Sequence, residues 1–496
     1  MSYKDFMRTV EELGNVNEIR SVLHWDQEVQ MPEEGVKARS RQLSTLARIE
    51  HRTLASDELH DHVEQLEREE LDRDQEAVLR EVKREHERAR EVPVELLQDI
   101  AEKESECLDT WKEAREKGDF SIVEEELAEL VELKRDYAEK VNADKEAYQV
   151  LFEDYEPYIS FDRMEEILEQ LKEELTELLE RIREDGVEIE SSAFRGDFDR
   201  ERQKEFNEKV LELLGYDRAR AKLNVSEHPF TVGNQFDTRI TTRYNTEDLS
   251  ESVMPTIHEY GHALYCLGLD QDNYGNPLGQ ARDLAVHESQ SRLWENHVGR
   301  SRQFWEFLLP EVREAFPGQM EGVSVEDCYE SVNRYDPENL VRVHADEASY
   351  HLHIILRFEL ERKLVNGEIE VEELPRLWNK KMEDLLGVAP GTESEGVLQD
   401  IHWYQGSIGY FPTYSLGSVI SAQIFETAKD EIDNMDEKIE RGEFEELQDW
   451  LRENIHSEGK RYRTGQLIEK ITGSKPSAEP FLDYIREKYS ELYGLE

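Results

Sequence analysis

The chain has 496 residues, a formal net charge of −54 and a sequence pI of about 4.6. This charge argues against nucleic acid and anionic membrane surfaces as partners, because both are polyanions. The acidic residues are spread along the whole chain and aromatic residues make up 9%, which argues against disorder. At molar salt the Debye length falls to about 3 Å, so surface repulsion of this size is screened. We therefore expect a folded protein from a salt-accumulating organism.

The cysteines and the N-terminal segment indicate the compartment. Cys107, Cys266 and Cys328 lie far apart and cannot form a disulfide framework, which favours a reducing compartment. The first twenty residues are charged and lack the apolar core of a signal peptide. Residues 401–425 are uncharged, but they contain too many polar groups for a transmembrane helix. The sequence predicts a cytoplasmic location.

Residues 1–220 have the pattern of long amphipathic helices. Apolar residues recur at intervals of three and four in VEELGNVNEIRSVLHW, ARSRQLSTLARIEHRTL, DQEAVLREVKREHERAREV and FDRMEEILEQLKEELTELLERIRE. Many Glu and Arg residues stand four apart on the outer faces of these segments. We expect this part to form an N-terminal helical lobe.

The pattern changes at about 221–244, which is rich in Val, Thr, Phe and Ile and alternates around 236–242. This region predicts one small β-meander. Helical patterns then resume to the C-terminus. We expect a mainly α fold in one large domain, residues 1–496, with a catalytic lobe at 221–496 and the small sheet beside the helix that follows it. The uncharged run at 401–425 predicts either a buried wall of a pocket or an ordinary core helix.

The helix expected at 249–268 carries HEYGH at 258–262. Positions four apart share one helix face, so His258 and His262 can bind one ion. Glu259 lies about 100° around the helix from His258, where its carboxylate can reach a water on that ion. This is the HExxH arrangement of zinc peptidases, with two His ligands and a Glu as general base.

A hydrolytic zinc site needs a third protein ligand and an open position. Glu288, in AVHESQSRLWENHVG, lies 26 residues beyond His262 on another helical segment. A helical hairpin of this length brings the second helix back beside the first, which makes Glu288 the expected third ligand. His287 is the competing candidate, and we expect it to support the site from behind the ligands. Cys266 is expected to be a packed apolar side chain.

Several strings together resemble the carboxypeptidase Taq family of metallocarboxypeptidases. They are LHWDQEVQMPEEGVKARSRQ at 23–42, HPF at 228–230, DTRIT at 237–241, HEYGH at 258–262, HESQ at 287–290, VRVHAD at 341–346 and GVLQDIHW at 396–403. The strings follow one another over nearly the entire chain. The main departure is Val341, where the family usually has Ile.

The resemblance implies a saddle-like helical structure with a deep active-site cleft. It implies release of single residues from peptides with a free C-terminal carboxylate, with broad specificity. It also implies Zn²⁺ as the cofactor, with Co²⁺ as a possible substitute, and a homodimer. The implied ligands are His258, His262 and Glu288, and the implied catalytic acid/base is Glu259. In that mechanism a metal-bound water, whose pKa is lowered to about 7, attacks the scissile carbonyl.

The strings also suggest residues for substrate binding. Tyr410, in GSIGYFPTY, is our candidate donor to the oxyanion, with Tyr414 and His402 behind it. A guanidinium suits the substrate's terminal carboxylate, and among Arg239 and Arg342 we prefer Arg342. A structural ion pair of Arg342 with Asp346, four residues on, is the alternative. The residues expected to line or brace the cleft are His228, Gln399, Asp400 and His402.

Two rival functions stay open at this stage. The first is a zinc aminopeptidase or oligoendopeptidase with the same HExxH chemistry. The second is a non-catalytic helical scaffold with a degenerate site. Nucleotide chemistry has no support, because neither a P-loop nor a Rossmann glycine pattern is present.

Overall fold

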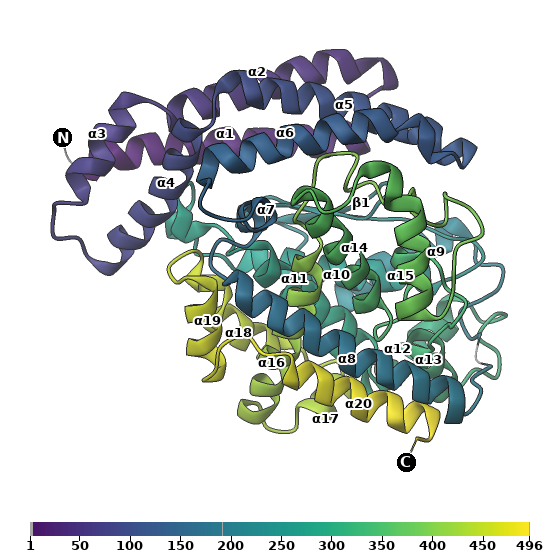
Figure 1. Ribbon diagram of the computed structural model, residues 1–496. Coiled ribbons are helices and arrows are strands. Elements are labelled where there is room, and N and C mark those ends of the chain that lie inside the picture. The colour runs from purple at the N-terminus through teal and green to yellow at the C-terminus, as the bar shows by residue number, and fades with distance from the viewer. Residues whose placement is uncertain (1–2, 191, 496) are drawn as a thin grey trace.

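The computed structural model describes residues 3–190 and 192–495. Within these ranges the chain forms twenty α-helices and one three-stranded sheet, which confirms the mainly α fold (Figure 1). The N-terminal helices are α1 (Tyr3–Val29), α2 (Val36–Leu54), α3 (Asp57–Leu66), α4 (Arg73–Glu91), α5 (Val94–Lys117) and α6 (Glu124–Asn142). The next helices are α7 (Ala147–Tyr155), α8 (Phe161–Asp185) and α9 (Arg200–Leu213).

The second half of the chain contains the sheet and eleven more helices. The strands are β1 (Ala221–Val225), β2 (Thr231–Gly233) and β3 (Thr238–Thr242). The helices are α10 (Ser250–Gly268), α11 (Leu284–Arg292), α12 (Arg302–Ala315), α13 (Val325–Asn333), α14 (Tyr350–Val365), α15 (Leu374–Leu386), α16 (Pro412–Glu431), α17 (Met435–Glu440), α18 (Glu445–Asn454), α19 (Thr464–Thr472) and α20 (Glu479–Tyr493). No helix of the described residues is both long enough and apolar enough to cross a bilayer.

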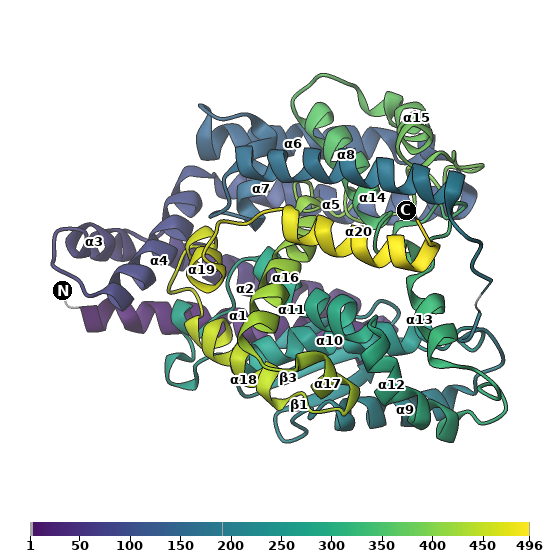
Figure 2. The ribbon, with the colours of Figure 1, turned by 90° about the horizontal axis from the view of Figure 1, so that it is seen from below.

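The long helix α8 shows how the amphipathic pattern becomes structure. Ser160 caps its N-terminus by accepting a hydrogen bond from the backbone N–H of Arg163. Its apolar residues, spaced three and four apart, are buried on one face, and Gly186 follows its last turn. That face packs against α14, α16 and α20, which lie far away in the sequence (Figure 2).

Two apolar cores form inside the molecule. A small core joins α1, α3 and α4 around Phe6, Leu59 and Val78. The main core extends from Cys107 to Tyr493 and therefore crosses the proposed boundary at residue 220. The assignment of one domain with two lobes stays a prediction.

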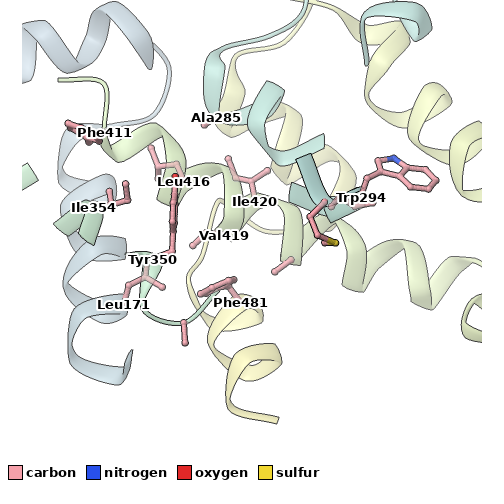
Figure 3. Packing of buried hydrophobic residues seen from close by; sticks show 14 of the residues in the cluster. Leu171, Ala285, Trp294, Tyr350, Ile354, Phe411, Leu416, Val419, Ile420 and Phe481 are labelled. Atoms are coloured by element: carbon pink, nitrogen blue, oxygen red, sulfur yellow. The ribbon is translucent and has the colours of Figure 1, made fainter. Parts of the chain in front are cut away.

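Helix α16 lies at the centre of the main core. It contacts α8, α11, α14, α19 and α20. Figure 3 shows Leu416, Val419 and Ile420 of α16 among Phe481 of α20 and Ile354 of α14. The uncharged run at 401–425 thus lies mostly in a buried helix and the turns before it. Tyr414 and Ser418 of the same helix line a cavity, so one part of α16 is also a pocket wall.

The sheet lies at the expected place, but its topology is not a meander. The strand order is β1-β3-β2, with β1 parallel to β3 and β2 antiparallel to β3. A meander would pair β1 with β2 and have antiparallel neighbours throughout. Here β2 returns on the far side of β3, and β3 becomes the central strand. Ile240 and Thr242 of β3 are fully buried, and the hydroxyl of Thr256 in α10 bonds that of Thr242 at 3.0 Å. This contact fixes the HEYGH helix against the sheet.

The string at 23–42 has a structural role that joins α1 to the rest of the chain. The guanidinium of Arg39 pairs with Asp26 at 2.6 Å. The guanidinium of Arg239 in β3 lies over the ring of Trp25 at 4.3 Å and pairs with Asp237 at 2.7 Å. These contacts hold the end of α1 beside β2 and β3.

Candidate metal centre

Three potential ligand atoms meet between α10 and α11. His258 and His262 project from one face of α10, and Glu288 faces them from α11. The Nε2 atoms of His258 and His262 lie 3.6 and 3.4 Å from Glu288 Oε2. All three ligand atoms lie within 4.8 Å of one another. Among the described residues this is the one group of three or more His, Cys, Asp or Glu side chains arranged to hold a metal ion. Two imidazoles and one carboxylate are a donor set that suits Zn²⁺.

Glycines at two positions allow these elements to lie so close together. A Cβ on Gly261, within HEYGH, would lie 2.5 Å from the backbone oxygen of Gln290 in α11. A Cβ on Gly417 of α16 would lie 2.5 Å from Cγ of Glu288. Both distances are too short for a side chain, so the close packing of α10, α11 and α16 depends on glycine here.

The Nδ1 atoms of His258 and His262, which face away from Glu288, both have hydrogen-bond partners. Nδ1 of His258 donates to Glu295 at 2.8 Å, and Nδ1 of His262 shares a hydrogen bond of 2.6 Å with Nδ1 of His287. The Sγ of Cys266 lies 3.7 Å from Nε2 of His287. Burial and the neighbouring His262 lower the pKa of His287 to about 3, so its ring is neutral. With both Nδ1 atoms occupied, each Nε2 is directed towards Glu288. His287 lies behind His262 and outside the three-atom group, and Cys266 is buried.

Positive charge keeps the Glu288 carboxylate ionised. Burial alone would raise its pKa, but the Arg292 guanidinium and the two imidazoles hold that pKa well below its usual range. The Nε atom of Arg292 donates to Glu288 at 2.7 Å. A metal ligand must be deprotonated, so the carboxylate is in the form that ligation requires.

Glu259 is held beside this group by the sheet. Its side chain is 5% exposed and lines the same cavity as His258 and Glu288. The hydroxyl of Thr231 in β2 donates to Glu259 Oε2 at 2.5 Å. One carboxylate oxygen is thus fixed, and the other can act on a proton in the cavity.

The cavity has a volume of about 550 Å³. Of the predicted cleft residues it is lined by His228, Arg342, Gln399, Asp400, His402 and Tyr414. The described lining of this cavity does not include Arg239, whose guanidinium is engaged by Asp237 and Trp25. Tyr410 also lies outside the lining, but its ring packs against those of Tyr414 and His402 at centroid distances of 5.2 and 5.6 Å.

Arg342 belongs to a buried cluster with a surplus of positive charge. Its Nε and Nη2 atoms bond Asp400, the latter at 2.7 Å, and Nη1 donates to the hydroxyl of Tyr350 at 3.2 Å. Arg357 of α14 donates to the other oxygen of Asp400 at 2.5 Å and to Gln399 at 2.8 Å. Burial lowers the pKa of Arg357 to about 10, so this group stays protonated at neutral pH. Two guanidiniums around one carboxylate leave one net positive charge on the wall of the cavity.

Asp346 was the partner of Arg342 in the alternative interpretation, a structural ion pair, but it has other partners. It accepts hydrogen bonds from the backbone N–H groups of Ala348 and Ser349, both at 3.0 Å, and from the hydroxyl of Tyr489 at 3.2 Å. The ion pair of Arg342 is formed with Asp400, which lies 58 residues further along the chain.

Tyr410 and Tyr414 stand at the start of α16, close to Glu288. Burial and the negative charge of Glu288 raise the pKa of Tyr410, so its phenol keeps its proton. The Nε2 atom of His402 lies 3.2 Å from the hydroxyl of Tyr414, and burial lowers the pKa of His402 to about 3. The Tyr410 phenol is therefore neutral and can donate a hydrogen bond, whereas the Tyr414 hydroxyl already has His402 as a partner.

The sequence reasoning missed several residues of the site. Glu295 stands two helical turns after Glu288 on the same predicted segment, which was a usable signal. Tyr350 lies between two guanidiniums: that of Arg342 bonds its hydroxyl, and that of Arg292 lies 4.6 Å from the centre of its ring. Only the tertiary structure shows these contacts. Thr231 gave no signal in the sequence, because its role depends on the strand order.

Comparisons with known proteins agree with this geometry. A family model described as carboxypeptidase Taq (M32) metallopeptidase matches residues 5–489. The thermostable carboxypeptidase 1 of Thermus thermophilus is 39% identical, with 99% of each chain covered. The thermostable carboxypeptidase 1 of Pyrococcus furiosus is 38% identical, with 98% of each chain covered. A solved structure of a Pyrococcus furiosus carboxypeptidase superposes with a TM-score of 0.95 at 37% identity, again over 98% of each chain.

Proposed function

Because the chain belongs to the carboxypeptidase Taq family of metallopeptidases and is a metal-dependent carboxypeptidase, we propose that His258, His262 and Glu288 hold its metal ion. The observation that carries this proposal is the convergence of their three ligand atoms within 4.8 Å, with His258 and Glu288 lining the same cavity as Glu259 and Arg342. The donor set favours Zn²⁺, with Co²⁺ as a substitute. When bound, such an ion supplies Lewis acidity that activates water and polarises a carbonyl group.

Glu259 is the proposed general base and acid. Its free carboxylate oxygen takes a proton from the attacking water and passes it to the leaving amine. The hydrogen bond from Thr231 supports this role, because it holds one oxygen and leaves the other to face the cavity. Tyr410 is the proposed donor to the developing oxyanion, and its protonated phenol supports that assignment.

The proposed site for the substrate's terminal carboxylate is the positive cluster around Arg342. Asp400 neutralises only one of two guanidiniums, and Tyr350 holds the Arg342 side chain from the other side. A pre-oriented guanidinium with unused N–H groups can bind a carboxylate without first being ordered. Gln399, His402, Tyr414 and His228 complete the lining. Arg239 receives no substrate role in this proposal, since its guanidinium is engaged away from the cavity.

Contacts in and around the cavity disfavour an aminopeptidase and a degenerate scaffold. An aminopeptidase needs unpaired carboxylates for the substrate's ammonium group, whereas Asp400 is paired with arginines and Glu347 with Lys488 at 2.7 Å. A degenerate scaffold would have no reason to keep both Nδ1 atoms of the histidine pair occupied.

A comparison of two variants tests the proposed centre. Equilibrium loading with Zn²⁺ or Co²⁺ should reach one ion per chain in the wild type and in Glu259→Gln. Activity should be lost in Glu259→Gln, while His262→Ala should lose both the ion and the activity. Stoichiometric metal in His262→Ala with unchanged affinity would rule out this ligand set.

We also propose that the protein is a homodimer in the cytoplasm of a salt-accumulating organism. The net charge of −54 supports adaptation to high salt, and the three free, buried cysteines support a reducing compartment such as the cytoplasm. The homodimer is proposed because the resemblance to the family implies it. Light scattering in multimolar KCl should give twice the chain mass of 58.4 kDa, and a mass of one chain would contradict this.

A further inference from the structure

The segment that follows α11 is a π-helical turn, Leu293–Gly299, and all seven of its residues are buried. π-Helical segments are rare, appear mostly as single turns within α-helices, and are frequently found at functional sites. This turn carries Glu295, whose side chain faces α10. The turn therefore marks Glu295 as a residue with a function beyond packing.

Both oxygens of Glu295 are engaged. Oε2 accepts from Nδ1 of His258 at 2.8 Å and from Nη1 of Arg292 at 3.3 Å, and Oε1 accepts from Nη2 of Arg300 at 3.1 Å. Arg292 also donates to Glu288, so it joins the carboxylate beside His258 to the third proposed ligand. The carboxylate of Glu295 cannot rotate without breaking several charge-assisted hydrogen bonds, which are each about twice as strong as neutral ones.

The two histidines of HEYGH differ in what stands behind them. Nδ1 of His262 is bonded to another imidazole, that of His287, whereas Nδ1 of His258 is bonded to the carboxylate of Glu295. A carboxylate behind a ligating imidazole fixes the ring orientation and makes the opposite nitrogen a better electron donor. An imidazole in the same place gives orientation with less of this electronic effect. The pair is therefore expected to be asymmetric, with His258 the stronger ligand.

We propose that Glu295 is a positioning residue that fixes the ring of His258 and strengthens its Nε2 as a metal ligand. Arg292 and Arg300 hold the carboxylate in place, and the π-helical turn presents it to α10. This inference rests on the proposed ligation by His258, His262 and Glu288. It extends that proposal to a residue that does not touch the ion.

The test is metal affinity in three variants, measured by competition with a chelating dye for Zn²⁺ and Co²⁺. Glu295→Gln keeps an oxygen that can accept from His258 but removes the charge, and Glu295→Ala removes both. Loss of such a partner typically weakens metal affinity by roughly 10–100-fold. We expect the loss of metal affinity to lie near the lower end of this range for Glu295→Gln and near its upper end for Glu295→Ala. Glu359→Gln is the matched control, because Glu359 is also a partly buried carboxylate bound by two cations, Lys172 and Lys381.

Each outcome has one meaning. Wild-type affinity in Glu295→Gln and Glu295→Ala, with a wild-type protein that binds metal, would overturn the inference. A wild-type protein that binds no metal would overturn the proposed function instead. A purely structural role would lower the melting temperature of the metal-free variants and leave affinity unchanged, which would also overturn the inference. The visible absorption spectrum of the Co²⁺-loaded Glu295→Gln protein should shift if His258 changes as a ligand, and this readout does not depend on activity.

Discussion

The glycine within HEYGH should be as necessary to the metal centre as the histidines beside it. In Gly261→Ala, the new Cβ would lie 2.5 Å from the backbone oxygen of Gln290 and 2.6 Å from Cα of Ser291. These are backbone atoms of α11, so no side-chain rotation can relieve the contact. The two helices would have to separate by roughly 1 Å to restore van der Waals distance. Overpacking of this kind costs about 1–3 kcal/mol of stability.

Gly261→Ala should also lower activity in the protein that remains folded. His258 and His262 lie on one of the separated helices, and Glu288 lies on the other. A displacement of about 1 Å in an active site can cost roughly 10²-fold in rate. We expect kcat/KM to fall by about that factor and metal affinity to fall with it, both measured below the melting temperature.

Gly465→Ala is the matched control for this prediction. Gly465 is also in a helix, α19, but a Cβ there would meet only the oxygen of Tyr158 at 3.8 Å, an ordinary contact. This substitution should be neutral or stabilise the fold by about 0.5–1 kcal/mol. Wild-type kcat/KM and metal affinity in Gly261→Ala would refute the claim that glycine sets the spacing of α10 and α11.

Three further predictions concern the substrate and the solvent. Arg342→Ala should reduce kcat/KM for peptides with a free C-terminal carboxylate by roughly 10–100-fold, from the loss of a charged hydrogen bond worth about 1.5–3 kcal/mol. The residual activity on C-terminally amidated peptides should not change, and equal losses on both substrates would remove Arg342 from the carboxylate site. Tyr410→Phe should lower kcat by about 10²–10³-fold without loss of metal, as expected for an oxyanion donor. Unaltered kcat would exclude that role. The melting temperature should rise from low to multimolar KCl, because salt screens a net charge of −54. A flat profile in calorimetry would count against adaptation to salt.

Local spacing explains why the sequence could predict that His258, His262 and Glu288 lie together. His258 and His262 share a face in any helix, so two ligands follow from the i, i+4 rule alone. Glu288 required one tertiary assumption, a helical hairpin, and α11 does return beside α10. The buried face of α8 also followed directly from its apolar spacing.

Contacts between distant segments explain what the sequence did not predict. The same i, i+4 rule suggested Asp346 as an alternative partner of Arg342, but the observed partner, Asp400, is brought near by the packing of α14 and the turns before α16. Among 115 acidic residues the only sequence signal for Glu295 was its seven-residue spacing from Glu288, and the π-helical turn that directs it to His258 has no sequence pattern of its own. The sheet was expected as a meander because neighbouring strands usually pair in sequence order, whereas here β3 pairs with both others.

The most direct test of the central claim is mass analysis of the products that the purified protein makes from an N-acetylated peptide in multimolar KCl. We expect a ladder of single-residue losses from the C-terminus. The ladder should stop in the presence of a metal chelator and resume when Zn²⁺ or Co²⁺ is restored. Internal fragments, an intact peptide, or a ladder that continues unchanged in the chelator would contradict a metal-dependent carboxypeptidase built on His258, His262 and Glu288.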